Sequence, residues 1–64
     1  MKHVATIKFQ DADSNDEGFA FVRADAESVA LGLSLKTNGD LEVVMPHESA
    51  RALIAALQEA VSPQ

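Results

Sequence analysis

The chain has 64 residues, of which 47% are hydrophobic, and its formal net charge at pH 7 is −5. This length gives a single small domain over residues 1–64, and the hydrophobic content excludes an intrinsically disordered chain. The negative charge argues against a nucleic-acid backbone as partner, and the absence of cysteine excludes disulfides and thiolate metal sites.

Alternating apolar and polar residues predict three strands in the first half of the chain. The first strand is Lys2–Gln10, and a polar turn over residues 11–18 follows it. The second and third strands are Phe19–Ala24 and Val29–Lys36. The third strand has the clearest period of two, and its apolar row is Val29, Leu31, Leu33 and Leu35.

The turn over residues 37–40, Thr-Asn-Gly-Asp, leads into a fourth strand, and the parity of the two strands predicts the turn type. A two-residue Asn-Gly loop would put the apolar residues of the two strands on opposite faces. A three-residue loop keeps them on one face and needs Gly39 in the left-handed region. This register pairs Leu35 with Leu41, Leu33 with Val43 and Leu31 with Met45.

A proline and an amphipathic helix follow the fourth strand. Pro46 ends that strand, because it cannot donate a ladder hydrogen bond, and it suits the start of a helix. A helix of about four turns is not stable alone in water, so its apolar stripe is expected to pack on the sheet. The stripe is Ala50, Leu53, Ile54, Leu57 and Val61, and its expected contacts are Phe9, Phe21, Leu31, Leu33 and Val43. The sequence thus predicts an α+β fold: a four-stranded antiparallel β-meander followed by one C-terminal amphipathic α-helix packed on one sheet face (ββββα).

Carried back along the chain, the same parity sets Phe21 opposite Leu31 and Phe9 opposite Phe19, on the helix side. The other face then carries small apolar residues, where an exposed sheet face usually carries long charged ones. Such a face reflects strand propensity alone or packs on a second sheet. We expect packing, because a chain this small without disulfides has little core. The predicted assembly is a homodimer, formed by an edge strand or by this face, whose interaction residues are Val4, Ala20, Val22, Ala30, Gly32 and Val44.

The acidic loop over residues 11–17 matches the start of a calcium-binding loop, because Asp11, Asp13 and Asn15 fit the pattern D-x-[DN]-x-[DN]. The match ends there, since the sixth and twelfth positions, where calcium loops need Gly and Glu, hold Asp16 and Val22. These three residues are the candidate metal ligands, and a cation-binding module is an alternative function. The acidic residues expected to contact a protein partner are Asp13, Asp16 and Glu17.

No motif brings catalytic residues together. His3 and His47 lack the spacing of a metal site, and strand parity sets His3 across from Asp25 as a surface pair. Ser49 lies in the first turn of the predicted helix, where serine ordinarily bonds the backbone. The three glycines stand apart, so there is no phosphate-binding loop. We therefore predict no enzyme activity and no cofactor.

These features favour a small acidic protein that acts through protein–protein contacts, a regulatory or accessory protein of the kind found in bacteria or phages. The alternatives are the cation-binding module and a nucleic-acid-associated protein, which the charge disfavours. The first residues, Met-Lys-His-Val-Ala-Thr, are not typical of a signal peptide. No apolar run reaches the roughly 20 residues of a membrane span, so we expect a cytoplasmic protein without membrane or nucleic-acid partners.

Overall fold

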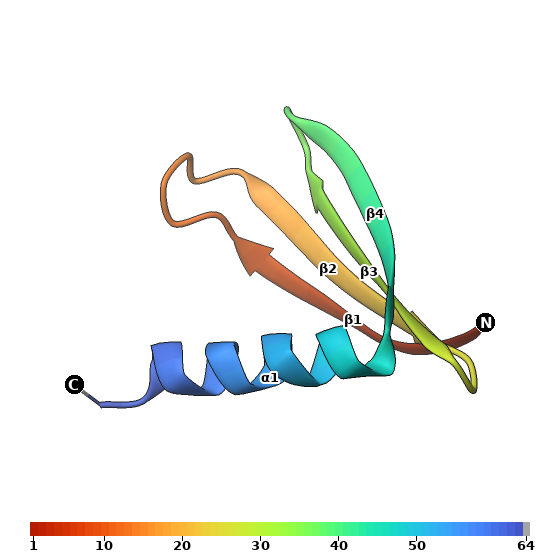
Figure 1. The fold of residues 1–64 in the computed structure, drawn as a ribbon. Coiled ribbons are helices and arrows are strands. Elements are labelled where there is room, and N and C mark those ends of the chain that lie inside the picture. The colour runs from red at the N-terminus through yellow and green to blue at the C-terminus, as the bar shows by residue number, and fades with distance from the viewer. Residues whose placement is uncertain (64) are drawn as a thin grey trace.

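Four strands form one antiparallel sheet in sequence order, β1-β2-β3-β4, in a computed structural model that describes residues 1–63 (Figure 1). They are β1 (Lys2–Gln10), β2 (Glu17–Ala24), β3 (Ser28–Leu35) and β4 (Gly39–Pro46), and the helix α1 (His47–Val61) follows. The predicted ββββα fold is confirmed. Within residues 1–63, α1 is too short and too polar to cross a membrane.

The β3–β4 hairpin has the predicted faces but a different register. Gly39 has φ +81°, as predicted, yet it is the first residue of β4 and pairs with Leu35. The loop therefore comprises residues 36–38, and the backbone N–H of Asn38 donates to the carbonyl oxygen of Leu35 at 3.2 Å. The observed pairs are Leu33 with Leu41, Leu31 with Val43 and Val29 with Met45. The predicted pairs were wrong by two residues, a shift that leaves both apolar rows on one face.

β2 faces the opposite way from the prediction. Val22, not Phe21, pairs with Leu31, and Gly18, not Phe19, pairs with Phe9. Each predicted pair was wrong by one residue, and a one-residue shift inverts a strand. The one-residue errors in the β2–β3 and β1–β2 registers cancel at β1. The two faces of β1 are therefore as predicted, and only those of β2 are exchanged. Its helix-side residues are Gly18, Ala20, Val22 and Ala24, and its other side carries Phe19, Phe21 and Arg23.

An aromatic ring covers a glycine on each face of the sheet. On the side away from the helix, Phe21 lies over Gly32, so a β-carbon at position 32 would overlap the ring. On the helix side, a β-carbon at Gly18 would lie 2.8 Å from Phe9 Cζ and 3.0 Å from a methyl carbon of Leu35. Both glycines are buried, and each makes room for a ring from the neighbouring strand.

α1 begins directly after β4 and runs beneath one face of the sheet, as Figure 1 shows. Pro46 is both the last residue of β4 and the N-cap of α1. The backbone of α1 approaches β3 and β4 but not β1 or β2 within the described chain. No described residue of the helix is buried. The predicted burial of Leu53, Ile54 and Leu57 against the sheet is therefore wrong, since Ile54 and Leu57 are 55% and 56% exposed.

Candidate interaction surface

The side of the sheet that faces α1 is apolar except at the start of β1, where Lys2 pairs with Ala24. Residues paired across the strands point to the same face, so the register defines this set. None of its members carries a charge from Ala5 to Met45. We call it, together with the stripe Ala50, Leu53, Ile54 and Leu57 of α1, the open face. Its strand residues are Ala5, Ile7, Phe9, Gly18, Ala20, Val22, Ala24, Val29, Leu31, Leu33, Leu35, Leu41, Val43 and Met45.

A groove of about 420 Å³ separates α1 from the sheet. The helix contributes the four stripe residues to its wall, and the sheet contributes six apolar residues: Val4, Val22, Ala24, Val29, Leu31 and Met45. In a closed α+β domain, these side chains would interdigitate and exclude such a space. The groove therefore shows that α1 does not complete a core within its own chain.

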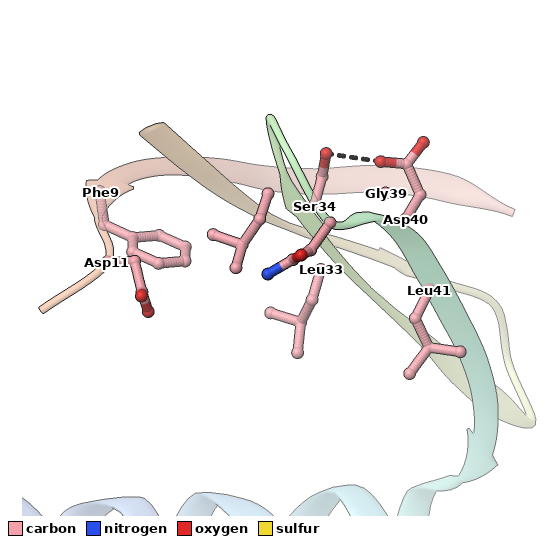
Figure 2. Close-up of a pocket in the computed structure, with 9 residues that line it drawn as sticks. Phe9, Asp11, Leu33, Ser34, Gly39, Asp40 and Leu41 are labelled. Carbon is pink, nitrogen blue, oxygen red and sulfur yellow. Dashed lines mark hydrogen bonds between the residues drawn. The ribbon is translucent and has the colours of Figure 1, made fainter. Parts of the chain in front are cut away.

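The open face continues beyond the helix into a recess of about 330 Å³ near the β3–β4 turn. Figure 2 shows Phe9, Leu33 and Leu41 pointing toward the side on which α1 lies. On the opposite side, the Ser34 hydroxyl donates to Asp40 Oδ1 at 2.6 Å. Leu41 is 64% exposed, although it belongs to an apolar cross-strand pair with Leu33. Large apolar side chains are thus uncovered at both ends of the face.

The chain exposes much more surface than a folded monomer of its size. Its accessible area is 5022 Å², whereas a monomer of 6.8 kDa is expected to expose about 4,000 Å². Its radius of gyration is 12.9 Å, compared with about 11 Å for a compact chain of this length. Ala30 is the single hydrophobic residue of the described chain that is buried. An excess of about 1,000 Å² is close to what each subunit contributes to a stable dimer.

The opposite side of the sheet, the outer face, is more polar and better packed. Arg23 Nη2 donates to both carboxylate oxygens of Glu42 at 2.7 Å, and Phe21 lies over Gly32. His3 Nε2 and the Thr6 hydroxyl are 3.3 Å apart. Long polar side chains and the rings of Phe19 and Phe21 therefore lie on this face.

The predicted interaction residues do not form one patch. Ala20 and Val22 lie on the helix side because β2 is inverted, and Val4 lines the groove beside a β-bulge between His3 and Ala5. The outer face holds the other three, of which Ala30 and Gly32 are buried and Val44 is exposed. The single small-residue patch expected on the outer face is therefore wrong. The parity rule did not detect the inversion, but Gly32 in the middle of a strand is a signal for a close cross-strand ring.

In the acidic loop, side-chain oxygens accept hydrogen bonds from the loop's own residues. Asp11 Oδ2 accepts hydrogen bonds from the backbone N–H and the hydroxyl of Ser14, at 2.8 and 2.7 Å. These bonds, led by that of the hydroxyl, lower the pKa of Asp11 from its ordinary value. Asn15 takes φ 68°, and the Thr37 hydroxyl donates to Asp16. No three His, Cys, Asp or Glu residues converge on a metal site in residues 1–63. The candidate set Asp11, Asp13 and Asn15, which includes an asparagine, stays a prediction.

The turn between β2 and β3 is organised by Asp25 and supports the start of α1. Asp25 Oδ1 accepts hydrogen bonds from the backbone N–H groups of Glu27 and Ser28, at 3.0 and 2.8 Å, and from the Ser28 hydroxyl at 3.0 Å. These bonds lower the pKa of Asp25, that from Glu27 most strongly. His47 Nε2 donates to the Asp25 carbonyl oxygen at 3.2 Å. The histidine near Asp25 is therefore His47, and the predicted pairing with His3, which lies across from Arg23, is wrong.

Comparison with protein-family models, curated proteins and solved structures finds no match to this chain. Its function is therefore inferred from the chain's own surfaces. The two carboxyl groups with shifted pKa values, Asp11 and Asp25, are exposed groups that hold turns, and the large concave surface is apolar.

Proposed function

We propose that this chain is a non-catalytic protein-binding protein that works as a homodimer, with the open face as the dimer interface. The observation that carries the proposal is the excess of about 1,000 Å² of accessible surface over a compact monomer. Burying that area on two chains gives about 2,000 Å² in total, the lower end of the range for obligate homodimers. Such interfaces resemble a domain core cut in half, and the open face has that composition.

The open face is the part of the surface on which a second copy of this acidic chain can bind without repulsion between like charges. The chain carries a net charge of −5, so most of its surface would repel a copy of itself. The charged residues of the open face lie at its margins, where Lys2 pairs with Ala24 and where Asp11 and Asp40 line the recess. The apolar area between these margins can meet that of a second copy without like-charge contacts. In a two-fold dimer, the same patch is used on both subunits. The Leu53, Ile54 and Leu57 stripe of each helix would then fill the groove or cover the recess of the other chain.

The dimer would leave the outer faces and the acidic loops exposed. None of Asp13, Asp16 and Glu17 lines the groove. Asp13 is exposed in the β1–β2 connection, Asp16 accepts a hydrogen bond from the Thr37 hydroxyl, and Glu17, the first residue of β2, pairs with Lys8 at 3.5 Å. We therefore assign the open face to self-association and the acidic, more polar surface to regulatory or accessory binding of another protein. This division replaces the predicted dimer interface on the outer face.

Sedimentation equilibrium tests the dimer, with a matched pair of variants. Ile54→Glu places a charge on the open face, and Val44→Glu places one on the outer face; the two parent residues are 55% and 61% exposed. We expect the wild-type protein and Val44→Glu to sediment as dimers. Ile54→Glu should sediment as a monomer or unfold, because an unpaired carboxylate in an apolar interface is costly. A folded wild-type monomer at high micromolar concentration would overturn the proposal.

A further inference from the structure

The two edges of the sheet differ in their protection against strand pairing. An edge strand exposes unpaired backbone groups, which proteins usually protect with lysines, bulges or prolines. β1 has two such features, because its register shifts between His3 and Ala5 and it carries Lys2 and Lys8. β4 pairs with β3 without a register shift along its whole length, and it has no lysine. Its one proline, Pro46, is at the very end. β4 is therefore the open edge of this sheet.

We propose that the free edge of β4 binds an extended segment of a partner protein, in which cationic residues alternate with apolar ones. The segment would add a fifth strand, with backbone hydrogen bonds supplying affinity and alternate side chains supplying specificity. This inference names the class of partner for the protein-binding function proposed above, and it rests on that function. Strand addition at the β4 edge does not require the open face. The edge hydrogen bonds lie in the plane of the sheet, whereas the side chains of the open face point out of that plane.

The alternation of β4 determines which side chains fit. On the outer face, β4 presents Asp40 and Glu42, so a neighbouring strand is stabilised there by Lys or Arg. On the helix side it presents Leu41, Val43 and Met45, which favour apolar neighbours. The Ser34 hydroxyl orients Asp40 without neutralising it, whereas Arg23 pairs with both carboxylate oxygens of Glu42 and compensates its charge. Asp40 therefore supplies the uncompensated negative charge of this edge. The acidic side chains are thus fixed on one side of the edge before a partner arrives.

The same charges disfavour a second copy at this edge. In a two-fold antiparallel pairing centred on Leu41, Asp40 of one chain would face Glu42 of the other. In a pairing centred on Glu42, the two Glu42 side chains would face each other. Like charges directly opposite one another destabilise a strand pair. A pairing centred on Val43 would set Glu42 opposite Val44 and Asp40 opposite Pro46, without like charges facing each other. Charge complementarity therefore favours a cationic partner segment over a copy of this acidic chain paired in either of the first two registers.

The test uses an eight-residue peptide of alternating Lys and Val with blocked ends, added to the full-length protein at low ionic strength. Binding is followed by backbone amide shifts in NMR and by hydrogen exchange. We expect shifts and slower exchange in β4, with β1 unchanged. An alternating Glu-Val peptide should not bind, and a block peptide of four Lys followed by four Val should bind more weakly. Changes at β1, or equal binding of the block peptide, would overturn the proposal.

Two variants separate strand addition from general attraction between opposite charges. Asp40→Asn and Asp13→Asn remove the same charge, the first beside the β4 edge and the second in the acidic loop. Asp40→Asn should weaken binding of the alternating peptide roughly two- to fivefold, the effect of one cross-strand charge pair. Asp13→Asn should change it little, and equal effects would overturn the proposal.

Sedimentation of the same samples distinguishes this inference from the proposed dimer. If the peptide binds β4 and the protein is a monomer, the dimer proposal fails and the edge proposal stands. If the peptide dissociates a dimer by displacing β4, the edge is occupied by a second copy and the edge proposal fails. If the dimer stays intact and the peptide slows exchange in β4, both proposals hold.

Discussion

The loss of stability on replacing Leu57 by alanine tests whether a second chain covers the open face. Leu57 lines the groove and is 56% exposed, so a little under half of its surface is covered within one chain. Full burial of a leucine side chain contributes roughly 1.5–3 kcal/mol, so the substitution should cost an isolated chain only about 1 kcal/mol. If a second copy covers the remainder, the cost rises to about 2–5 kcal/mol per chain, the range for buried leucines.

Urea unfolding, followed by circular dichroism at a few micromolar and at a few hundred micromolar chain, provides the assay. We expect the midpoint of the wild-type protein to rise with concentration, because association stabilises the folded state by mass action. Leu57→Ala should lower the midpoint by the amount expected when a second copy covers the leucine, not by the smaller amount expected for an isolated chain. Val44→Ala on the outer face, where the parent is 61% exposed, should cost less than Leu57→Ala at both concentrations. A concentration-independent midpoint, with Leu57→Ala costing about 1 kcal/mol, would refute the reasoning.

Three further substitutions test local features by their effect on the free energy of unfolding. Gly32→Ala should cost about 1–3 kcal/mol, because its β-carbon would overlap the Phe21 ring, and adding Phe21→Leu should recover part of that loss. Gly39→Ala should cost about 1 kcal/mol, since φ +81° strains a residue with a β-carbon; an unchanged urea midpoint would contradict this. Asp25 has a lowered pKa in the folded state, so its contribution to stability is present above its ordinary pKa of 3.8 and is lost as pH falls through the lowered pKa. Asp25→Asn should therefore flatten the loss of stability in acid, as measured by urea midpoints between about pH 2 and pH 6.

The sequence predicted the elements of this fold well and one of its strand orientations badly. Period-two alternation located the four strands, and period-three and period-four spacing located the helix. The parity argument assumed that all large apolar residues share a face, and β2 violates it. Phe21 packs over Gly32 on the outer face, and the gap left by the missing side chain compensates for a ring outside the main apolar layer. The inversion is set by the registers of the β1–β2 and β2–β3 pairs, which alternation within single strands does not reveal.

The predicted apolar stripe is present on α1, but the pattern could not show which surface packs against it. An apolar stripe specifies that something packs on it, not whether that surface belongs to the same chain. The interaction residues Ala20 and Val22 were predicted for a dimer interface on the outer face, and they lie instead on the open face. The physical motive for self-association, a core too small for the chain, holds in the structure even though the predicted face does not.

The junction between β4 and α1 explains why the chain leaves its own core open. β4 is an edge strand, and α1 starts at His47, immediately after Pro46, with no loop residue between the two elements. A helix that leaves an edge strand without a loop has little freedom to turn back across the whole sheet. Its backbone accordingly approaches β3 and β4 and leaves the helix side of β1 and β2 uncovered. Ile7 on β1 and Leu57 on α1 lie on the same side of the sheet, and each remains 56% exposed. A second chain can supply the missing layer, because the same short junction leaves the same surface open in each copy.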